Sequence, residues 1–271
     1  LVADGMEAFA LRGHSARSAG RSLDIQTYIW HDDLTGRLLA AEVLDAADRG
    51  VQVRVLLDDL DARAKSQALL ALDSHPRISI RIYNPFATRE GMLGTAFEFA
   101  SDFARVNRRA HNKSWIVDGR LAIAGGRNVG DEYMGRDPVE NASNELEPRG
   151  WRDTHLRLEG PVVRDLEAVF FESWFRAGGS ELAWEELLRE APQACGGVRC
   201  GVLTDGPHYP RRRMRETLRR ALRATARSAR LTSPYFIPGH RLLRAFEEIT
   251  ARQVAVQLLV SGKSHPALQH A

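Results

Sequence analysis

Hydrophobic positions in the chain follow two spacings, one typical of helices and one typical of strands. Apolar residues recur every three or four positions in some windows and form short continuous runs in others. The spacing predicts helices over residues 4–20, 36–49, 64–72 and 161–176, and strands over residues 23–30, 51–57, 78–83 and 155–158. Strands that alternate with helices favour an α/β sandwich built on a mixed sheet.

A separate pattern predicts a β-hairpin over residues 111–126. Two strand-like runs flank Asp118 and Gly119, and this dipeptide is a signal for a two-residue type I′ turn. A two-residue loop sets the register of the hairpin and places Val117 opposite Arg120.

That register decides which side chains share a face of the hairpin. It places Lys113 opposite Ala124 and His111 opposite Gly126, so that small residues leave room on this face. His111, Lys113 and Asn128 then project together. A neutral imidazole can attack phosphorus, while an ammonium and an amide can hold phosphate oxygens. The pattern predicts phosphoryl chemistry, and none of these roles needs a metal or another cofactor.

The spacing of these residues also matches a known signature. His-x-Lys, four residues, Asp, six residues, Gly-Gly and then Asn occur here as His111, Lys113, Asp118, Gly125, Gly126 and Asn128. The chain thereby resembles the phospholipase D superfamily, and segments such as LDIQTYIWHDDLTG and SPYFIPG resemble its bacterial cardiolipin synthase branch. The resemblance implies a phospholipase D-like α-β-α sandwich with a mixed sheet.

The resemblance further implies a reaction. It is a phosphodiesterase or phosphatidyltransferase reaction on a phospholipid such as phosphatidylglycerol, with a phosphohistidine intermediate on His111. Lys113, Asn128 and Gly126 would bind the phosphate. Asp118 and Gly125 would support the motif structurally.

An attacking histidine needs a partner that holds its far ring nitrogen in the right tautomer. The resemblance implies an acidic residue for this task, and Asp153 in the segment WRDTHLRLEGP matches that position. Asp118 lies at the predicted turn, where a structural role suits it better. Asp131 and Glu132 remain weaker alternatives for the orienting carboxylate.

The end of the chain echoes its beginning. ARSAGRSLDIQTYIW is echoed by ATARSARLTSPYFI, and DRGVQVRVLLDD is echoed by ARQVAVQLLVSGK. We therefore expect a first half-domain over residues 1–176, a linker over 177–201 and the start of a second, incomplete half-domain over 202–271. The superfamily pairs two His-x-Lys motifs, one histidine attacking and the other protonating the leaving group. One such motif occurs here, so we expect the chain to be inactive alone.

Charge raises the question of a partner. The net charge is only +3, yet nine arginines gather within residues 211–230, where apolar spacing predicts a helix with a basic face. Such a face is often merely solvated, but it can also meet an anionic membrane or a nucleic acid. No apolar run approaches the roughly 20 residues of a membrane helix. The two cysteines, Cys195 and Cys200, do not complete a zinc site.

Three functions therefore stay open at this point. The first is a phospholipid enzyme in the bacterial cytoplasm or peripheral at the inner membrane. The second is a nuclease of the same superfamily, and the third is a non-catalytic module that binds phosphate or anionic lipid. The sequence gives no indication of an oligomeric state.

Overall fold

The computed structural model describes residues 1–59, 66–85, 111–135, 151–180, 186, 189–205, 213–233 and 236–260. The chain divides into two compact units, Leu1–Val202 and Leu203–Ala271. Each unit has its own sheet and its own apolar core, so the two are described separately.

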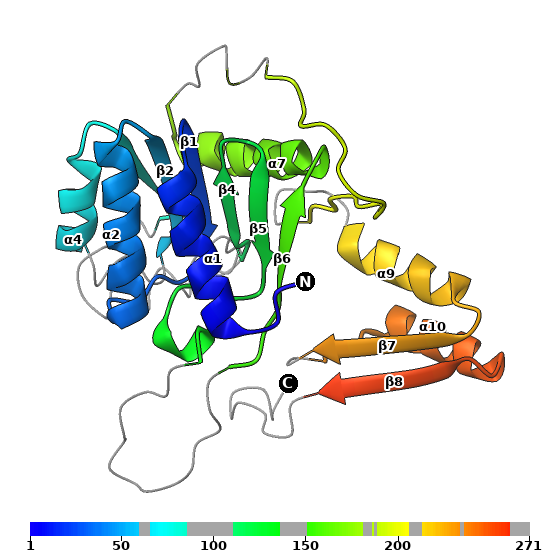
Figure 1. The fold of residues 1–271 in the computed structure, drawn as a ribbon. Helices are drawn as coiled ribbons and strands as arrows, with labels where there is room; N and C mark the ends of the chain where they lie inside the picture. Colours follow the sequence, from blue (N-terminus) through cyan, green and yellow to red (C-terminus); the bar gives the residue numbers. More distant parts are fainter. Residues whose placement is uncertain are drawn as a thin grey trace, which may run out of the picture. The chain divides into compact units, whose positions relative to one another are not determined.

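The first unit is built on one mixed sheet (Figure 1). Its elements in chain order are α1 (Gly5–Ser18), β1 (Ser22–Thr27), α2 (Leu34–Asp48), β2 (Gln52–Asp58), α4 (Ser66–Asp73), β3 (Ile78–Tyr83), β4 (Ser114–Val117), β5 (Leu121–Gly125), η2 (Asp131–Tyr133), β6 (His155–Glu159) and α7 (Val162–Arg176). The strands lie in the order β3-β2-β1-β4-β5-β6. β1, β2 and β3 are parallel, whereas β4, β5 and β6 join antiparallel.

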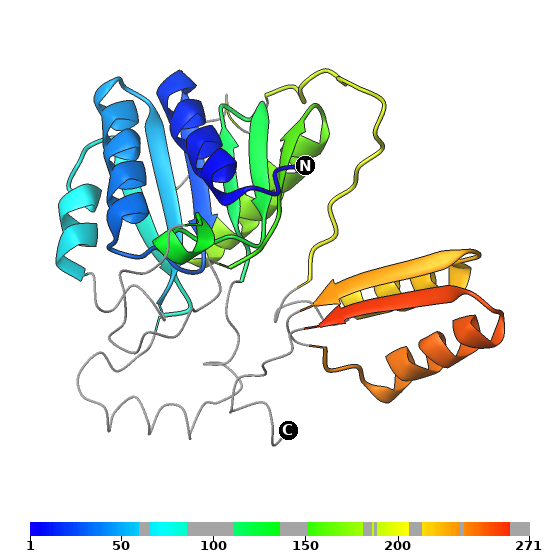
Figure 2. The same cartoon turned by 60° about the horizontal axis from the view of Figure 1, so that its bottom comes forward.

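Helices cover both faces of this sheet (Figure 2). α1, α2 and α4 pack on one face around residues such as Ile25, Leu39 and Val55. α7 packs on the other face, where Phe170 and Leu56 belong to a second apolar cluster. Neighbouring residues of a strand point to opposite faces, which is why β2 supplies both clusters. The predicted α-β-α sandwich with a mixed sheet is confirmed.

The hairpin of β4 and β5 has the predicted turn but not the predicted register. Asp118 and Gly119 have φ of 54° and 63°, and the N–H of Arg120 donates to the carbonyl of Val117 at 2.9 Å. However, Val117 pairs with Leu121 instead of Arg120. One extra residue therefore lies in the connection, and every pair along the hairpin shifts by one.

The predicted pairing of Lys113 with Ala124 is wrong, because the shift places Gly125 opposite Lys113, where the N–H of Gly125 donates to the carbonyl of Lys113 at 3.4 Å. Ala124 pairs with Ser114, and Ala122 lies in the cluster beneath α7. The physical reason is burial on both faces, since the observed register aligns Trp115 with Ile123 in the cluster beneath α1 and α2.

Asp118 ties this turn to the start of the neighbouring strand. Its carboxylate accepts hydrogen bonds from the backbone N–H groups of Gly20 at 3.0 Å, Arg21 at 2.7 Å and Ser22 at 2.9 Å. Three charge-assisted bonds to consecutive backbone groups hold the β4 turn against β1. In this structure Asp118 contacts the scaffold.

The second unit contains α9 (Arg213–Ala224), β7 (Ser228–Ser233), α10 (His240–Ala251) and β8 (Ala255–Val260). β7 and β8 pair in parallel, and their apolar residues share one cluster with both helices. The order helix, strand, helix, strand is the same as that of α1, β1, α2 and β2. Among the described residues of both units, every helix is too short or too polar to cross a bilayer.

Candidate active site

Four chain segments meet at one edge of the six-stranded sheet. They are the end of β1, the start of β4, the end of β5 and the start of β6, which adjoin because these neighbouring strands alternate in direction. The N–H of Val129 donates to the carbonyl of Ile29 at 3.1 Å, and the N–H of His31 donates to that of Val129 at 2.9 Å. The polar residues that these segments bring to the edge are Tyr28, His111, Lys113, Asn128 and Asp153.

His111 lies just before β4 and remains open to solvent on one side. Its ring centroid is 4.8 Å from that of Tyr28, with the two planes inclined at 54°. Partial burial and the Lys113 ammonium lower the pKa of His111, while the Asp153 carboxylate opposes them. Because a neutral imidazole is the nucleophilic form, this environment favours attack at neutral pH.

Lys113 is buried beside the same aromatic ring. Its Nζ donates to the backbone carbonyl of His111 at 2.8 Å and lies 5.3 Å from the centroid of the Tyr28 ring. Burial lowers the pKa of Lys113 to about 8, against the opposing charges of Asp153 and Asp58. The ammonium is thus largely charged at neutral pH and held close to the imidazole.

Asn128 is buried and held at both ends of its amide. Its Nδ2 donates to the hydroxyl of Tyr133 at 2.7 Å, and its Oδ1 accepts from the N–H of Ile29 at 3.2 Å. An amide nitrogen carries two hydrogens. The arrangement fixes the side chain and, among the described residues, engages one of these two hydrogens.

The two glycines of the motif make room for the chain that enters β6. A Cβ on Gly125 would lie 2.2 Å from the carbonyl oxygen of Thr154, and one on Gly126 would lie 2.2 Å from the carboxylate oxygens of Asp153. Both contacts are far shorter than real Cβ contacts. The missing side chains therefore let the Asp153 carboxylate approach the motif backbone.

Asp153 acts on the site through its charge. Within the described residues, no hydrogen bond joins its carboxylate to His111, and its Oδ1 instead accepts from the N–H of Thr154 at 2.6 Å. It still favours the charged forms of both His111 and Lys113. The expected hydrogen bond between Asp153 and the ring is therefore not seen among the described residues.

The alternative carboxylates have other contacts. Asp131 accepts a hydrogen bond from the N–H of Thr35 at 2.9 Å. Glu132 pairs with His31 at 3.1 Å, and ligand atoms of His31, Asp33 and Glu132 come within 4.8 Å of one another. Both oxygens of Asp33 accept backbone hydrogen bonds, and Asp33 is the N-cap of α2.

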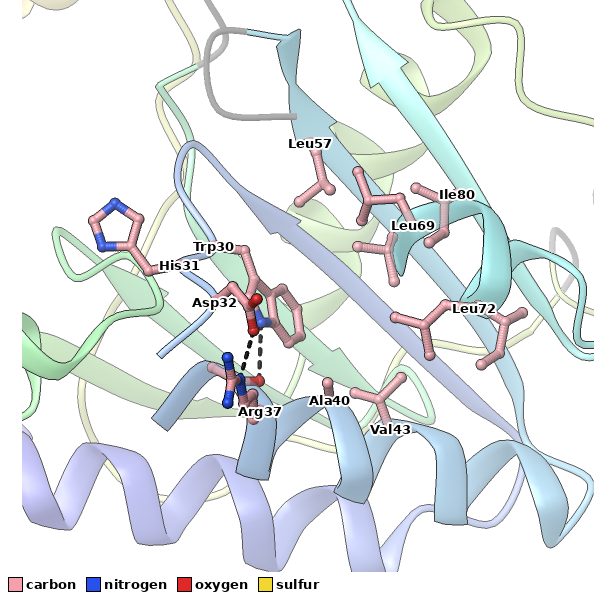
Figure 3. A pocket seen from close by; sticks show the side chains of 13 residues that line it. Trp30, His31, Asp32, Arg37, Ala40, Val43, Leu57, Leu69, Leu72 and Ile80 are labelled. Carbon is pink, nitrogen blue, oxygen red and sulfur yellow. Dashed lines mark hydrogen bonds and ion pairs between the residues drawn. The ribbon is translucent and has the colours of Figure 1, made fainter. Parts of the chain in front are cut away.

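An apolar pocket of about 100 Å³ lies between α2, α4 and the parallel strands (Figure 3). Aliphatic side chains such as Val43, Leu57 and Leu72 line it. Trp30 lies at its polar end, where its Nε1 donates to the carbonyl of Gly36 at 3.1 Å. A lining of this kind does not support phosphoryl transfer, so the polar edge with His111 is the better candidate.

Sequence reasoning missed Tyr28, Arg12 and Arg127. Arg12 and Arg127 are both buried, and Arg12 donates to the backbone carbonyls of Arg127 and Asn128, each at 3.0 Å. One signal was available: Arg12 follows Ala8 and precedes Ala16 by four residues, which places it on the buried face of α1.

Comparisons with known proteins identify relatives of this chain. A family described as "Cardiolipin synthase, PLD-like domain" matches residues 14–143. Cardiolipin synthase C of Escherichia coli K12 is 44% identical over 172 residues, covering 63% of this chain and 33% of that protein. Cardiolipin synthase A of Pseudomonas syringae pv. syringae B728a is 35% identical over 263 residues, covering 97% of this chain and 50% of that protein. The chain thus spans half or less of these relatives.

A solved structure shows the same fold at low sequence identity. Phosphatidylserine synthase of Haemophilus influenzae Rd KW20 matches with a TM-score of 0.62 at 10% identity, covering 96% of this chain and 60% of that one. This likeness shows the fold alone, and the sequence matches together with the motif identify the family. The chain carries a phospholipase D-like domain of the phospholipase D superfamily, with cardiolipin synthases among its homologues.

Proposed function

We propose that this chain supplies one half of a phospholipase D-type active site that transfers or hydrolyses a phosphatidyl group. One observation carries the proposal: the His111 imidazole, whose pKa is lowered, and the buried Lys113 ammonium both lie beside the ring of Tyr28. A nucleophile and a fixed cation are the two groups that attack on a phosphodiester requires.

In the proposed reaction a bond forms between a His111 ring nitrogen and phosphorus while the bond from phosphorus to the leaving alcohol oxygen breaks. The alcohol leaves with a proton from a general acid. An acceptor alcohol or water then attacks phosphorus, gives its proton to the same group, which now acts as a general base, and breaks the bond to His111. Lys113 and the Asn128 amide stabilise the charge that develops on the phosphoryl oxygens.

We do not assign the general acid that acts with His111 to a residue of this chain. The sequence contains one His-x-Lys motif, and we assign leaving-group protonation to a second histidine from the rest of the active site. Asp153 remains our candidate for stabilising the imidazolium, through its charge, once the ring acts on a proton. Within this scheme residues 1–176 are the first half-domain, 177–201 a linker and 202–271 the beginning of the second.

The substrate we propose is a phospholipid resembling phosphatidylglycerol, at the cytoplasmic face of a bacterial inner membrane. The cardiolipin synthase relatives support a phospholipid. α9, whose arginines include Arg215, Arg219 and Arg220, suits peripheral contact with anionic lipid. Comparing turnover of phosphatidylglycerol vesicles with cleavage of single-stranded DNA separates this function from the nuclease alternative.

The nucleophile is tested by His111→Ala in the full-length enzyme, with cleavage and transfer measured on phosphatidylglycerol vesicles. We expect the rate to fall by about 10⁴-fold or more because no covalent intermediate can form. His14→Ala is the matched control, since His14 is exposed on α1. A phosphorus adduct trapped on another histidine would assign the nucleophile there instead.

The half-site itself is tested with the 271-residue chain alone. Loss of general acid catalysis costs about 10² to 10⁴ in rate, and half of the phosphate-binding groups are lost with it. We expect sedimentation to give a monomer and a phosphodiesterase assay to give no turnover. An active symmetric dimer, in which two His111 rings meet, would contradict this proposal.

A further inference from the structure

Two guanidinium groups and one imidazole are buried together behind the motif segment. Arg12, Arg127 and His155 are all almost fully removed from solvent. Arg12 Nη2 lies 3.1 Å from His155 Nε2, and burial together with both arginines lowers the pKa of His155 to about 3. The imidazole is therefore neutral, so the two guanidinium groups are the charged members of this cluster.

Neither guanidinium is neutralised by a direct carboxylate partner among the described residues. Arg12 donates to the backbone carbonyls of Arg127 and Asn128. Arg127 donates to the carbonyls of Tyr133 at 3.2 Å and Val2 at 3.3 Å, and also to that of Ala3. Carbonyls accept from these guanidinium groups, although the buried Nε of Arg12 has no partner among the described residues. They do not cancel the charge, and buried charge without an opposite charge is costly.

The second unit shows what the fold requires at the position of Arg12. Arg12 lies ten residues before Ser22, the first residue of β1, and Leu218 of α9 lies ten residues before Ser228, the first residue of β7. Leu218 packs against the apolar core of its unit. A helix in this arrangement packs with an apolar side chain there, so the charge on Arg12 serves something other than the packing of the helix.

The charge lies directly behind the proposed phosphate site. Arg12 binds the carbonyl of Asn128, whose amide we assign to the phosphate. The Asp153 carboxylate, which acts on His111 and Lys113, also acts on Arg127. The Asp153 carboxylate thus acts on two of the positive charges, Lys113 and Arg127, and Arg127 in turn acts on Arg12.

We propose that Arg12, together with Arg127, is a positioning residue of the phosphate site. It holds the backbone that carries Asn128, and its charge is balanced when a phosphate group binds in front of that backbone. This inference rests on the proposed function. In this inference, buried charges that do not contact the ligand give the site its preference for phosphate groups.

The test is calorimetric binding of two probes, inorganic phosphate and dihexanoyl phosphatidylglycerol below its micelle concentration, to the 271-residue chain. Arg12→Gln removes the charge but keeps an N–H donor, and Arg12→Lys keeps the charge. Arg12→Met imitates the apolar packing of Leu218 and covers the case in which the glutamine variant does not fold. Arg17→Gln is the matched control, because Arg17 on the same helix pairs at the surface with Glu42.

We expect Arg12→Gln and Arg12→Met to weaken the binding of both probes about 10-fold. A nearby unit charge has an effect of this order at an effective dielectric near 20. Arg12→Lys should bind nearly as well as the unchanged chain, and Arg17→Gln should bind equally. A folded Arg12→Gln variant with unchanged affinity overturns the inference, as does an Arg12→Lys variant as weak as the glutamine variant. Weakening of the lipid probe alone also overturns it, because the charge acts on the shared phosphate.

Failure of the proposed function gives a different result. If the unchanged chain binds neither probe, the phosphate site itself is wrong and the inference falls with it. If the unchanged chain binds both and only the Arg12 variants behave unexpectedly, the phosphate site stands and the role of Arg12 is wrong.

Discussion

The opening α1-β1-α2-β2 segment and the closing α9-β7-α10-β8 segment share a scaffold but differ in what they bury. In both, two parallel strands lie under a pair of helices. An ion pair joins the helices in each segment, Arg17 with Glu42 and Arg223 with Glu248. The features that the two segments share therefore include the ion pair that joins their two helices.

The two segments also share a hydrogen bond between the same two helices. Arg49, just after α2, donates to the carbonyl of Arg17 at 3.0 Å, and Arg252, just after α10, donates to that of Arg223 at 2.8 Å. Each arginine satisfies a carbonyl at the end of the preceding helix, where helix carbonyls lack partners. The contact is thus part of the scaffold and independent of the chemistry at His111.

The buried polar groups differ between the segments. Asp24 pairs with Arg54 across β1 and β2 at 2.5 Å, and Arg54 also pairs with Glu186 at 2.7 Å. The same register positions in the second unit hold Arg230 and Gln257. The two strands can therefore pair without a buried ion pair. The ion pair occurs in the unit in which α7 covers this face of the sheet.

The largest effect should come from breaking that ion pair with Arg54→Met. Removing one partner of a buried pair typically costs about 3–5 kcal/mol, because the other charge stays buried without compensation. Urea unfolding followed by tryptophan fluorescence measures it, since all five tryptophans lie within residues 1–202. Gln257→Met in the second unit is the control and should leave this transition unchanged. An unaffected Arg54→Met variant would show that the segments differ less than we infer.

A slightly smaller effect should follow from truncating a covered strand residue. Leu56 and Leu259 occupy the same register position, yet Leu56 is 1% exposed and Leu259 is 67% exposed. Leu56→Ala should cost about 2–5 kcal/mol because it leaves a cavity, whereas Leu259→Ala should change stability by less than about 0.5 kcal/mol. Circular dichroism during urea unfolding follows both units. Equal losses would mean that both strands are covered in solution.

A third prediction concerns Lys113, which belongs to the site of the first unit. Because burial lowers the pKa of Lys113 to about 8, the ammonium loses its proton as the pH rises through that value. Phosphate affinity should then fall about tenfold per pH unit above 8, since one proton is linked to binding. Calorimetry between pH 6 and pH 10 measures this. Lys113→Gln should remove the dependence, and a flat profile in the unchanged chain would exclude Lys113 from the phosphate site.

The smallest effect should come from the repeated surface pairs. Exposed ion pairs contribute little and are screened by salt. Double-mutant cycles on Arg17 with Glu42 and on Arg223 with Glu248 should give small couplings that disappear at high salt. A large coupling in only one unit would break the proposed equivalence of the two helix pairs.

The sequence by itself determined the local features of this protein. Apolar spacing predicted the helices and strands, and Asp118 with Gly119 predicted the turn at which both residues have positive φ. The motif residues His111, Lys113, Gly125, Gly126 and Asn128 were recognisable because their spacing is itself a property of the sequence. Such features depend on neighbours within a few residues, so periodicity and turn chemistry suffice.

Only the tertiary structure decided the contacts between distant segments. Burial on both faces set the β4–β5 register one residue from the prediction. Chain direction at the sheet edge brought Tyr28 to His111, and the glycine backbone let Asp153 approach. Packing of α1 placed the charge of Arg12 behind Asn128. Each contact joins residues far apart in the sequence, and its free energy depends on what the whole fold buries, which no local pattern encodes.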